Sequence, residues 1–509
     1  MRAVAGVIFL AGLFALAGFG VLHAIRPLAI RPLRSAAVNV VASLGLAYLL
    51  GVSTVLVAAI ALLVFGVTLT LPAFTGLALA IGATGIAIGV LRETEPAAPN
   101  ELVPRALRTR VDRVFLVAAV VILGGYLLLV LPQYTSAPTV EWDSWSIWTR
   151  KAIALFQLDG LVPAFWSAKP YAFTHQDYPL LLPMLESLHF RAIGRLDAQS
   201  VHVQFWLLLL AFPWAMGYLA ARAGRAALWA PVVVGATLAP AIVTVIIGGL
   251  ADVPVALFVG AGVLAMGLWV DTRERFYLAV GVVLLAGAAS IKNEGLLAAA
   301  VILVMAGVVS LRERPVRPLR DLAVGAALWL IAIAPWQVWA ARAGVPKDVN
   351  AADGLNPIYL AKHIDRMWPA VKALEVQITD QGKWSWFLPL FLAVAVLALL
   401  VRQATRAAAF YLLCAGGVFA GLVWAYWASP HPLEAYIAQS AFRVVDGVAA
   451  VSMAALAHLA PRIATLAPFA GLPAEPSDGE LAALEAGKEP AAPAKGERLP
   501  AGLLAFWRA

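Results

Sequence analysis

The chain has 509 residues, of which 62% are hydrophobic and only 13% are charged, and its formal net charge is +8. Soluble domains carry about 25% charged residues, so the composition excludes a large soluble protein and indicates a chain that lies mostly within a membrane. The positive charge does not indicate nucleic-acid binding, because basic residues in cytoplasmic loops set membrane topology. The single cysteine, Cys414, excludes a disulfide framework and a cysteine-based metal site.

Apolar runs long enough to cross a bilayer recur along the chain and predict an all-α polytopic membrane protein. We expect about 13 transmembrane helices, within a range of roughly 11–14, because the block 37–91 has room for two helices or three. The expected spans are 3–23, 38–62, 68–91, 113–134, 203–221, 228–248, 252–270, 276–291, 295–311, 321–342, 386–401, 407–428 and 443–465.

Arginines are concentrated in loops that alternate along the chain, which places these loops together on the cytoplasmic side. They are Arg92, Arg105, Arg108, Arg110 and Arg113, then Arg222 and Arg225, Arg273 and Arg275, Arg312, Arg314, Arg317 and Arg320, and Arg402 and Arg406. The opposite side then receives the segments 135–202, 249–252, 292–294, 343–385 and 429–442. The unusual polar clusters of the chain fall within or beside these segments, so they share one membrane side.

The stretch "VEWDSWSIWTRKA" opens the first large outer loop and places Glu141 and Asp143 at the mouth of a membrane helix. A carboxylate near a low-dielectric boundary is costly unless it is paired or used. Residues two apart point to the same side of an extended chain but about 200° apart on a helix, so an extended connection would let the two converge on one ligand. The alternative is an ordinary solvated pair. The three neighbouring tryptophans are typical of an interfacial aromatic belt.

Two further polar stretches lie on the same side of the membrane. "THQDYPLLLP" offers His175 and Asp177 for proton transfer or ligand binding, or for a simple helix start with Pro179 in the first turn. "GGLADVP" holds Asp252 between two apolar spans with almost no loop, as a helix cap or a ligand contact.

Charged residues also interrupt the later apolar runs. In "SIKNEG", Lys292 is suited to hold a phosphate, and Glu294 either orients Lys292 or neutralises it in a surface turn. In "SPHPLEAYIAQSAFR", Arg443 runs against the positive-inside trend and is a candidate anion ligand or an interfacial anchor. His431 lies in the preceding loop. The chain has no Walker A, dinucleotide or HExxH motif.

The segments "WDSWSIWTRKA", "HQDYPLLLP", "ADVP" and "KNEG", in this order and on one membrane side, resemble the GT-C superfamily of integral-membrane glycosyltransferases. The similarity is to the bacterial branch that groups protein O-mannosyltransferases with lipid A aminoarabinose transferases. The motifs span about residues 141–295, and the helix pattern extends the resemblance to about residue 465.

The resemblance implies inverting transfer of a sugar from a polyprenyl-phosphate donor to a glycolipid, polysaccharide or protein on the periplasmic face of a bacterial inner membrane. It assigns the catalytic base to Asp143, with Glu141 second, and the donor phosphate to Lys292 and Arg443. The remaining candidates, His175, Asp177, Asp252, Glu294 and His431, are expected to bind substrate. Some relatives need a divalent metal, and Mg²⁺ or Mn²⁺ would find its ligands here in Asp143 and Asp177.

Three regions follow from this interpretation. Residues 1–112 hold the N-terminal membrane helices, and residues 113–465 form the GT-C-like catalytic module with outer loops 135–202 and 343–385. Residues 466–509 are rich in Pro, Ala, Glu and Gly and are expected to form a disordered cytoplasmic tail.

Three other functions stay open at this stage. A flippase or transporter of a lipid-linked glycan is disfavoured because no internal repeat is found. An O-antigen ligase or polymerase would use the loop 343–385, which has Arg366 and His363 but no dense arginine cluster. A structural protein of an envelope complex would not depend on Asp143.

Overall fold

The computed structural model describes residues 2–25, 33–92, 107, 109–136, 141–311, 316–347, 351–401 and 404–466. Contacts divide the chain into Met1–Ile463 and Ala464–Ala509, and the fold and the site lie in the first unit. The expected tail and the arginines Arg105, Arg108, Arg312, Arg314 and Arg402 lie outside the described residues.

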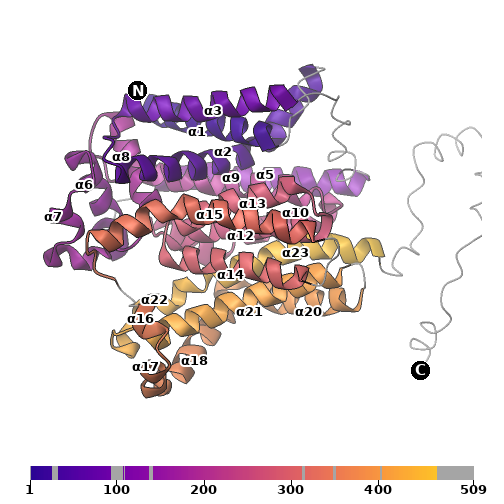
Figure 1. The fold of residues 1–509 in the computed structure, drawn as a ribbon. Coiled ribbons are helices and arrows are strands. Elements are labelled where there is room, and N and C mark those ends of the chain that lie inside the picture. The colour runs from indigo at the N-terminus through magenta and orange to yellow at the C-terminus, as the bar shows by residue number, and fades with distance from the viewer. Residues whose placement is uncertain are drawn as a thin grey trace, which may run out of the picture. The chain divides into compact units, whose positions relative to one another are not determined.

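The described residues form helices and no β-strand (Figure 1). The helices are α1 (Arg2–Ile25), α2 (Leu33–Val64), α3 (Leu71–Arg92), α5 (Arg110–Ser136), α6 (Arg150–Leu158), α7 (Pro163–Trp166), α8 (Leu181–Ile193), α9 (Val203–Ala220), α10 (Ala226–Thr237), α11 (Pro240–Ile247), α12 (Asp252–Thr272), α13 (Arg275–Ala289), α14 (Asn293–Ser310), α15 (Arg317–Arg342), α16 (Ala351–Gly354), α17 (Pro357–Lys362), α18 (Met367–Ile378), α19 (Gln381–Trp384), α20 (Phe387–Leu400), α21 (Thr405–Ala428), α22 (Leu433–Val444) and α23 (Asp446–Leu466).

The all-α, multi-pass architecture expected from the sequence is confirmed. Among the described residues, ten helices are long and apolar enough to cross a membrane, or eleven if α10 and α11, bent by 42° at a short break, form one span. Helices α13 and α20 coincide with two further expected spans but have only 15 and 14 residues. All the expected ranges thus overlap helices. When α10 and α11 are counted as one span, α13 and α20 account for the difference from the expected number of 13.

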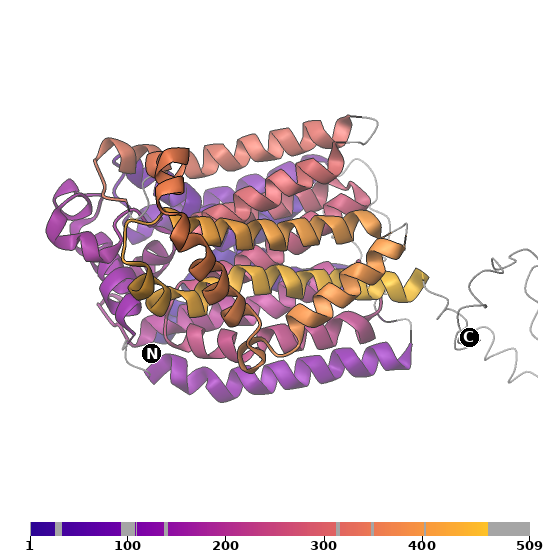
Figure 2. The same cartoon turned by 90° about the horizontal axis from the view of Figure 1, so that it is seen from below.

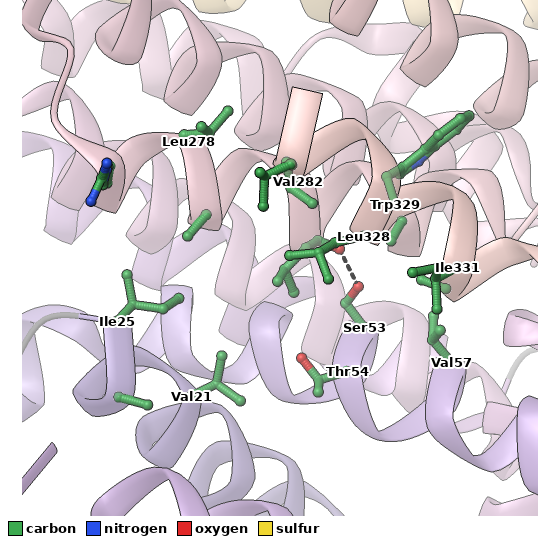
Figure 3. Close-up of a pocket in the computed structure, with 18 of the residues that line it drawn as sticks. Val21, Ile25, Ser53, Thr54, Val57, Leu278, Val282, Leu328, Trp329 and Ile331 are labelled. Atoms are coloured by element: carbon green, nitrogen blue, oxygen red, sulfur yellow. Dashed lines mark hydrogen bonds between the residues drawn. The ribbon is translucent and has the colours of Figure 1, made fainter. Parts of the chain in front are cut away.

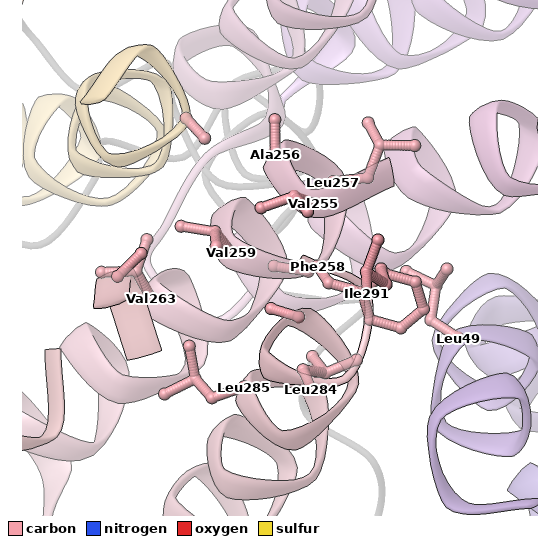
Figure 4. Close-up of a cluster of buried hydrophobic side chains, with 14 of the residues drawn as sticks. Leu49, Val255, Ala256, Leu257, Phe258, Val259, Val263, Leu284, Leu285 and Ile291 are labelled. Atoms are coloured by element: carbon pink, nitrogen blue, oxygen red, sulfur yellow. The ribbon is translucent and has the colours of Figure 1, made fainter. Parts of the chain in front are cut away.

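Helix α12 forms the centre of the bundle. It is apolar around its whole circumference, and its residues from Asp252 to Val270 are buried, as expected for a helix surrounded by other helices. It packs against α13 and also contacts α9, α14 and α21. Figure 4 shows its Val255, Phe258 and Val259 in one cluster with Leu284 and Leu285 of α13 and Leu49 of α2.

Helices α1, α2 and α3 pack closely through small residues. A Cβ atom on Gly18 would lie 1.7 Å from the carbonyl oxygen of Ala47, and one on Gly51 would lie 1.8 Å from that of Phe14. Glycine is therefore required where α1 crosses α2, which is the close backbone approach typical of membrane helices. Figure 1 shows these three helices side by side along one flank of the bundle.

The two ends of the bundle differ in charge. Helix α12 runs from Asp252 to Thr272, and α13 returns from Arg275 to Ala289, so the "ADVP" and "KNEG" turns meet at one end, here called the site end. The short helices α6, α7, α16 and α17 also gather there, as Figures 1 and 2 show.

The opposite end, here called the arginine end, carries most of the expected cytoplasmic arginines among the described residues. Several are held by acidic partners: Arg222 lies 3.3 Å from Glu274, Arg225 lies 3.2 Å from the buried Asp112, and Arg275 lies 2.8 Å from Asp321. The charge separation expected along the chain is therefore present in space. Which side of a membrane each end faces stays a prediction.

Candidate active site

Asp143 and Arg443 meet at the site end. The Nη2 atom of Arg443 lies 2.5 Å from Oδ2 of Asp143, and its Nη1 atom lies 3.6 Å from Oδ2 of Asp252. Arg443 therefore links the segment between α5 and α6 to the start of α12. Its side chain is 10% exposed, so the pairing with two carboxylates compensates for the burial of its charge.

Asp252 and Lys292 form a second buried pair beside the first. The Nζ atom of Lys292 lies 2.8 Å from Oδ1 of Asp252 and 3.1 Å from Oε1 of Glu294. Ala251 holds the N-cap position of α12, and Asp252 is the first residue of the helix. Its carboxylate instead binds the two cations of the site, which favours the functional interpretation of the "ADVP" turn over the capping one.

The protonation of Lys292 is set by competing effects. Burial lowers the pKa of its ammonium group, but the negative charges of Asp252 and Glu294 outweigh burial and raise the pKa above its usual value. Lys292 therefore carries its positive charge throughout the physiological pH range. A fixed buried cation of this kind can stabilise an anion that reaches it.

The structure separates Glu141 from Asp143. The segment is helical from Trp142 and continues into the π-helix Ser144–Thr149, so the extended connection that would make the two carboxylates converge is not formed. Asp143 faces Arg443, whereas Glu141 is exposed and its Cγ atom lies close to Gly248. Asp143 is therefore the member of the pair that enters the charged cluster.

The "THQDYP" stretch lies beside the "KNEG" turn. The amide of Asn293 donates a hydrogen bond of 3.0 Å to Oδ2 of Asp177, and the indole of Trp336 donates one of 3.3 Å to the Asp177 carbonyl. His175 adopts a left-handed conformation with φ of 47°, and its ring stacks on Tyr178 with 4.9 Å between centroids. Asp177 thus borders the site, while His175 shapes the turn that positions it.

Lys151 holds the turn at residues 175–178 in place, a role that the sequence reasoning did not predict. Its side chain is fully buried, and its Nζ atom donates to the carbonyl oxygens of His175, at 2.5 Å, and Tyr178, at 3.4 Å. The rings of Trp148, Trp166 and Tyr178 surround the ammonium group at 5.6–5.8 Å. Trp148 is 1% exposed, so it is a core residue and not part of an aromatic belt, whereas Trp142 is 58% exposed.

His431 is an exposed residue of the same end and makes no contact with the charged cluster among the described residues. Its carbonyl oxygen accepts a hydrogen bond of 3.0 Å from Arg366. Arg366 also donates to the carbonyl of Ser429, so this arginine ties two outer segments together. His363 bonds the carbonyl of Tyr359. These contacts give Arg366 and His363 structural partners.

Asp446 is a second residue that the sequence reasoning missed. It is 2% exposed, and neither carboxylate oxygen has a hydrogen-bond partner among the described residues. The signal was available, because a carboxylate inside an apolar run is by default a functional candidate. It follows Arg443 by three positions in the sequence "FRVVDG".

A divalent metal does not fit the side chains that meet here. No group of three or more His, Cys, Asp or Glu side chains is arranged to hold a metal ion in the part of the chain that the structure describes. Asp143 engages Arg443 and Asp177 engages Asn293, so the two expected ligands have different partners. The site places carboxylates beside fixed cations. The carboxylates can accept a hydroxyl proton, and the cations can bind an anion.

Comparison of the chain with protein-family models, with curated proteins and with solved structures finds no match. The geometry of the cluster and the residue types are thus the basis for any assignment of function.

Proposed function

We propose that this protein is a membrane glycosyltransferase that moves a sugar from a polyprenyl-phosphate donor to a hydroxyl of an envelope acceptor, with inversion at the anomeric carbon. The observation that carries the proposal is the convergence of Asp143, Asp252, Lys292 and Arg443 at one end of the bundle. A carboxylate for a proton and two cations for a departing phosphate are the groups that this reaction needs.

In the proposed step Asp143 takes the proton of the acceptor hydroxyl. The acceptor oxygen forms a bond to the anomeric carbon from the face opposite the phosphate. The bond between that carbon and the phosphate oxygen breaks, and its electron pair stays on the phosphate. Arg443 and Lys292 bind this oxygen, and because Arg443 also contacts Asp143 at 2.5 Å, the proton acceptor and the phosphate holder are adjacent.

Asp252 has a positioning role in this scheme. Its two carboxylate oxygens lie 2.8 Å from Lys292 and 3.6 Å from Arg443, so it holds both cations on one side of the incoming phosphate. Asp177 and Glu294 border the same space and are proposed to contact the sugar or the acceptor. The acceptor class, whether glycolipid, polysaccharide or protein, and the periplasmic orientation belong to the proposal as well.

The test is transfer of label by the full-length protein reconstituted in liposomes. A panel of polyprenyl-phosphate sugars with radioactive sugar is offered with an envelope extract, and the wild type is compared with Asp143→Asn. The matched control is Asp159→Asn, which alters an outer-segment carboxylate whose side chain is 54% exposed and paired with Arg191. General-base loss lowers rates about 10²- to 10⁴-fold, so only Asp143→Asn should abolish the labelled product.

Two results would overturn the proposal. Undiminished transfer by Asp143→Asn would remove this residue as the base, and Glu141→Gln would then be compared. Absence of transfer from every donor, with chemically unchanged lipid-linked sugar crossing the bilayer of the same liposomes, would identify a flippase.

A further inference from the structure

A large crevice lies among α1, α2, α3, α13 and α15. Its volume is about 2320 Å³, well above the roughly 300–1,000 Å³ of small-molecule pockets. Figure 3 shows Ser53 and Val57 of α2 opposite Val282 of α13 and Ile331 of α15. The walls are mostly apolar, and Ile331 is 67% exposed, so the crevice is continuous with the lipid-facing surface.

One end of the crevice is strongly basic. Its lining includes six arginines, Arg92, Arg273, Arg275, Arg317, Arg320 and Arg406, and among the described lining residues only one acidic side chain, Asp321. These arginines lie at the ends of α3, α12, α13, α15 and α21. All belong to the arginine end of the bundle, opposite the charged cluster of the candidate active site.

Several of these arginines have partners within the described part of the protein. Arg275 pairs with Asp321 through two hydrogen bonds of 2.8 and 2.9 Å, and Arg92 donates to the carbonyl of Ala24 at 2.8 Å. Arg317 and Arg320 are exposed and have no acidic partner among the described residues. The mouth of the crevice therefore has positive charge that the described residues do not neutralise.

We propose that this crevice binds an anionic glycerophospholipid, with the phosphate at Arg317 and Arg320 and the acyl chains along the apolar walls of the crevice. Basic pockets between membrane helices bind the head groups of anionic lipids, and a guanidinium matches a phosphate with two parallel hydrogen bonds. The long apolar walls select a lipid over a soluble anion, because a free phosphate gains nothing from them.

The site is distinct from the one proposed for the sugar donor. Helix α12 has 21 residues, so its two ends are about 30 Å apart, and Lys292 and Arg443 lie at the far one. The proposal does not depend on the transferase reaction. It gives α1, α2 and α3 a role, since they supply one wall of the lipid site.

The experiment is native mass spectrometry of the full-length, delipidated protein in detergent with a titration of phosphatidylglycerol, against phosphatidylcholine of the same acyl chains. The test variant is Arg317→Gln/Arg320→Gln. The matched control is Arg195→Gln/Arg342→Gln, which removes two exposed arginines at the site end, one of them on α15 itself. Monodisperse elution on size exclusion establishes that each variant is folded.

We expect one phosphatidylglycerol to be retained by the wild type and by the control variant, and its retention to fall about tenfold in Arg317→Gln/Arg320→Gln, because two charge-assisted contacts are lost. Ala279→Phe, which fills the apolar wall but keeps every arginine, should also lower retention. Equal retention of phosphatidylcholine, or equal retention by both double variants, would overturn the proposal. Displacement of the lipid by millimolar inorganic phosphate would identify a soluble-anion site instead.

Discussion

Arg443 holds Asp143 and Asp252 at the same time, with its two terminal nitrogens 2.5 Å and 3.6 Å from one oxygen of each carboxylate. The three residues come from the segment between α5 and α6, the start of α12 and the last turn of α22. A fork-shaped guanidinium can bridge two carboxylates, which a single ammonium group cannot do with the same geometry. The arrangement therefore requires an arginine at position 443, because a lysine would not bridge both carboxylates.

Replacing Arg443 by lysine tests whether the guanidinium is required. We expect Arg443→Lys to keep the fold and lower turnover about 100-fold, since the charge stays but one bridging contact is lost. Arg443→Gln should be still slower and less stable, because it leaves Asp143 and Asp252 with less compensation. Turnover of labelled donor in liposomes is the measurement, and Arg195→Lys, at an exposed site, is the control. Full activity of Arg443→Lys would show that only the charge matters.

The Asp252 and Lys292 pair is expected to be strongly coupled. Each of Asp252→Asn and Lys292→Met should destabilise the protein by about 3–5 kcal/mol, because each leaves its buried partner under-compensated. The double variant should lose less than the sum, by roughly 1–3 kcal/mol. The double-mutant cycle is measured by thermal unfolding of the detergent-solubilised protein and its variants. The exposed pair Lys372 and Glu375, 2.8 Å apart, serves as a reference, and its coupling should stay below about 0.5 kcal/mol. Additive losses at Asp252 and Lys292 would contradict the pairing.

Glu186 predicts a pH dependence of stability. Burial raises the pKa of its carboxyl from the ordinary 4.5 to about 8, against an opposing hydrogen bond from Thr149. Between these values the folded chain keeps a proton that the unfolded chain releases, so stability falls as pH rises and levels off above about pH 8.

The free energy of unfolding should fall by about 1.4 kcal/mol per pH unit in this window, which amounts to a few kcal/mol in total. It is measured as the melting temperature between pH 5 and pH 9 for the wild type and Glu186→Gln. The neutral amide should remove the slope in this window. A variant that retains the wild-type slope would assign it to another group.

Lys151 is expected to affect catalysis through the turn that it supports. Lys151→Met removes the donor to the carbonyls of His175 and Tyr178, which frees the segment that carries Asp177. We expect KM for the acceptor to rise about tenfold and stability to fall by about 1–3 kcal/mol. Lys169→Met, at an exposed position of the same loop, should change neither quantity. An unchanged KM would mean that Asp177 is held without Lys151.

For Asp446 we expect that a substitution increases stability. A buried carboxylate without hydrogen bonds is costly, and a neutral amide of the same shape costs less. Asp446→Asn should therefore raise stability by about 1 kcal/mol or more and keep turnover within about threefold. Both are measured on the reconstituted protein. A loss of turnover above about 100-fold in a folded variant would place Asp446 in the catalytic machinery.

The sequence predicted the helices better than the contacts between them. Apolar runs fix where helices form, but a helix such as α12, apolar on all sides, carries no signal for which neighbour covers which face. Asp252 and Lys292 could thus be assigned to one membrane side without any indication that they touch. Whether Glu141 or Asp143 enters the charged cluster depends on the local backbone conformation. The sequence did not decide between a helical and an extended segment at this point. The GT-C resemblance stays a prediction.

The difference in length between α13 and α15 has a consequence for the chemistry. The two helices start together, where Arg275 pairs with Asp321, but α13 ends at Ala289 whereas α15 continues to Arg342. Trp336 of α15 donates to the carbonyl of Asp177, which borders the charged cluster, so α15 extends about 9 Å beyond the level of Asp177. A reaction at that depth would be shielded from bulk water. Water would then compete poorly with the acceptor, and little activated sugar would be lost to hydrolysis.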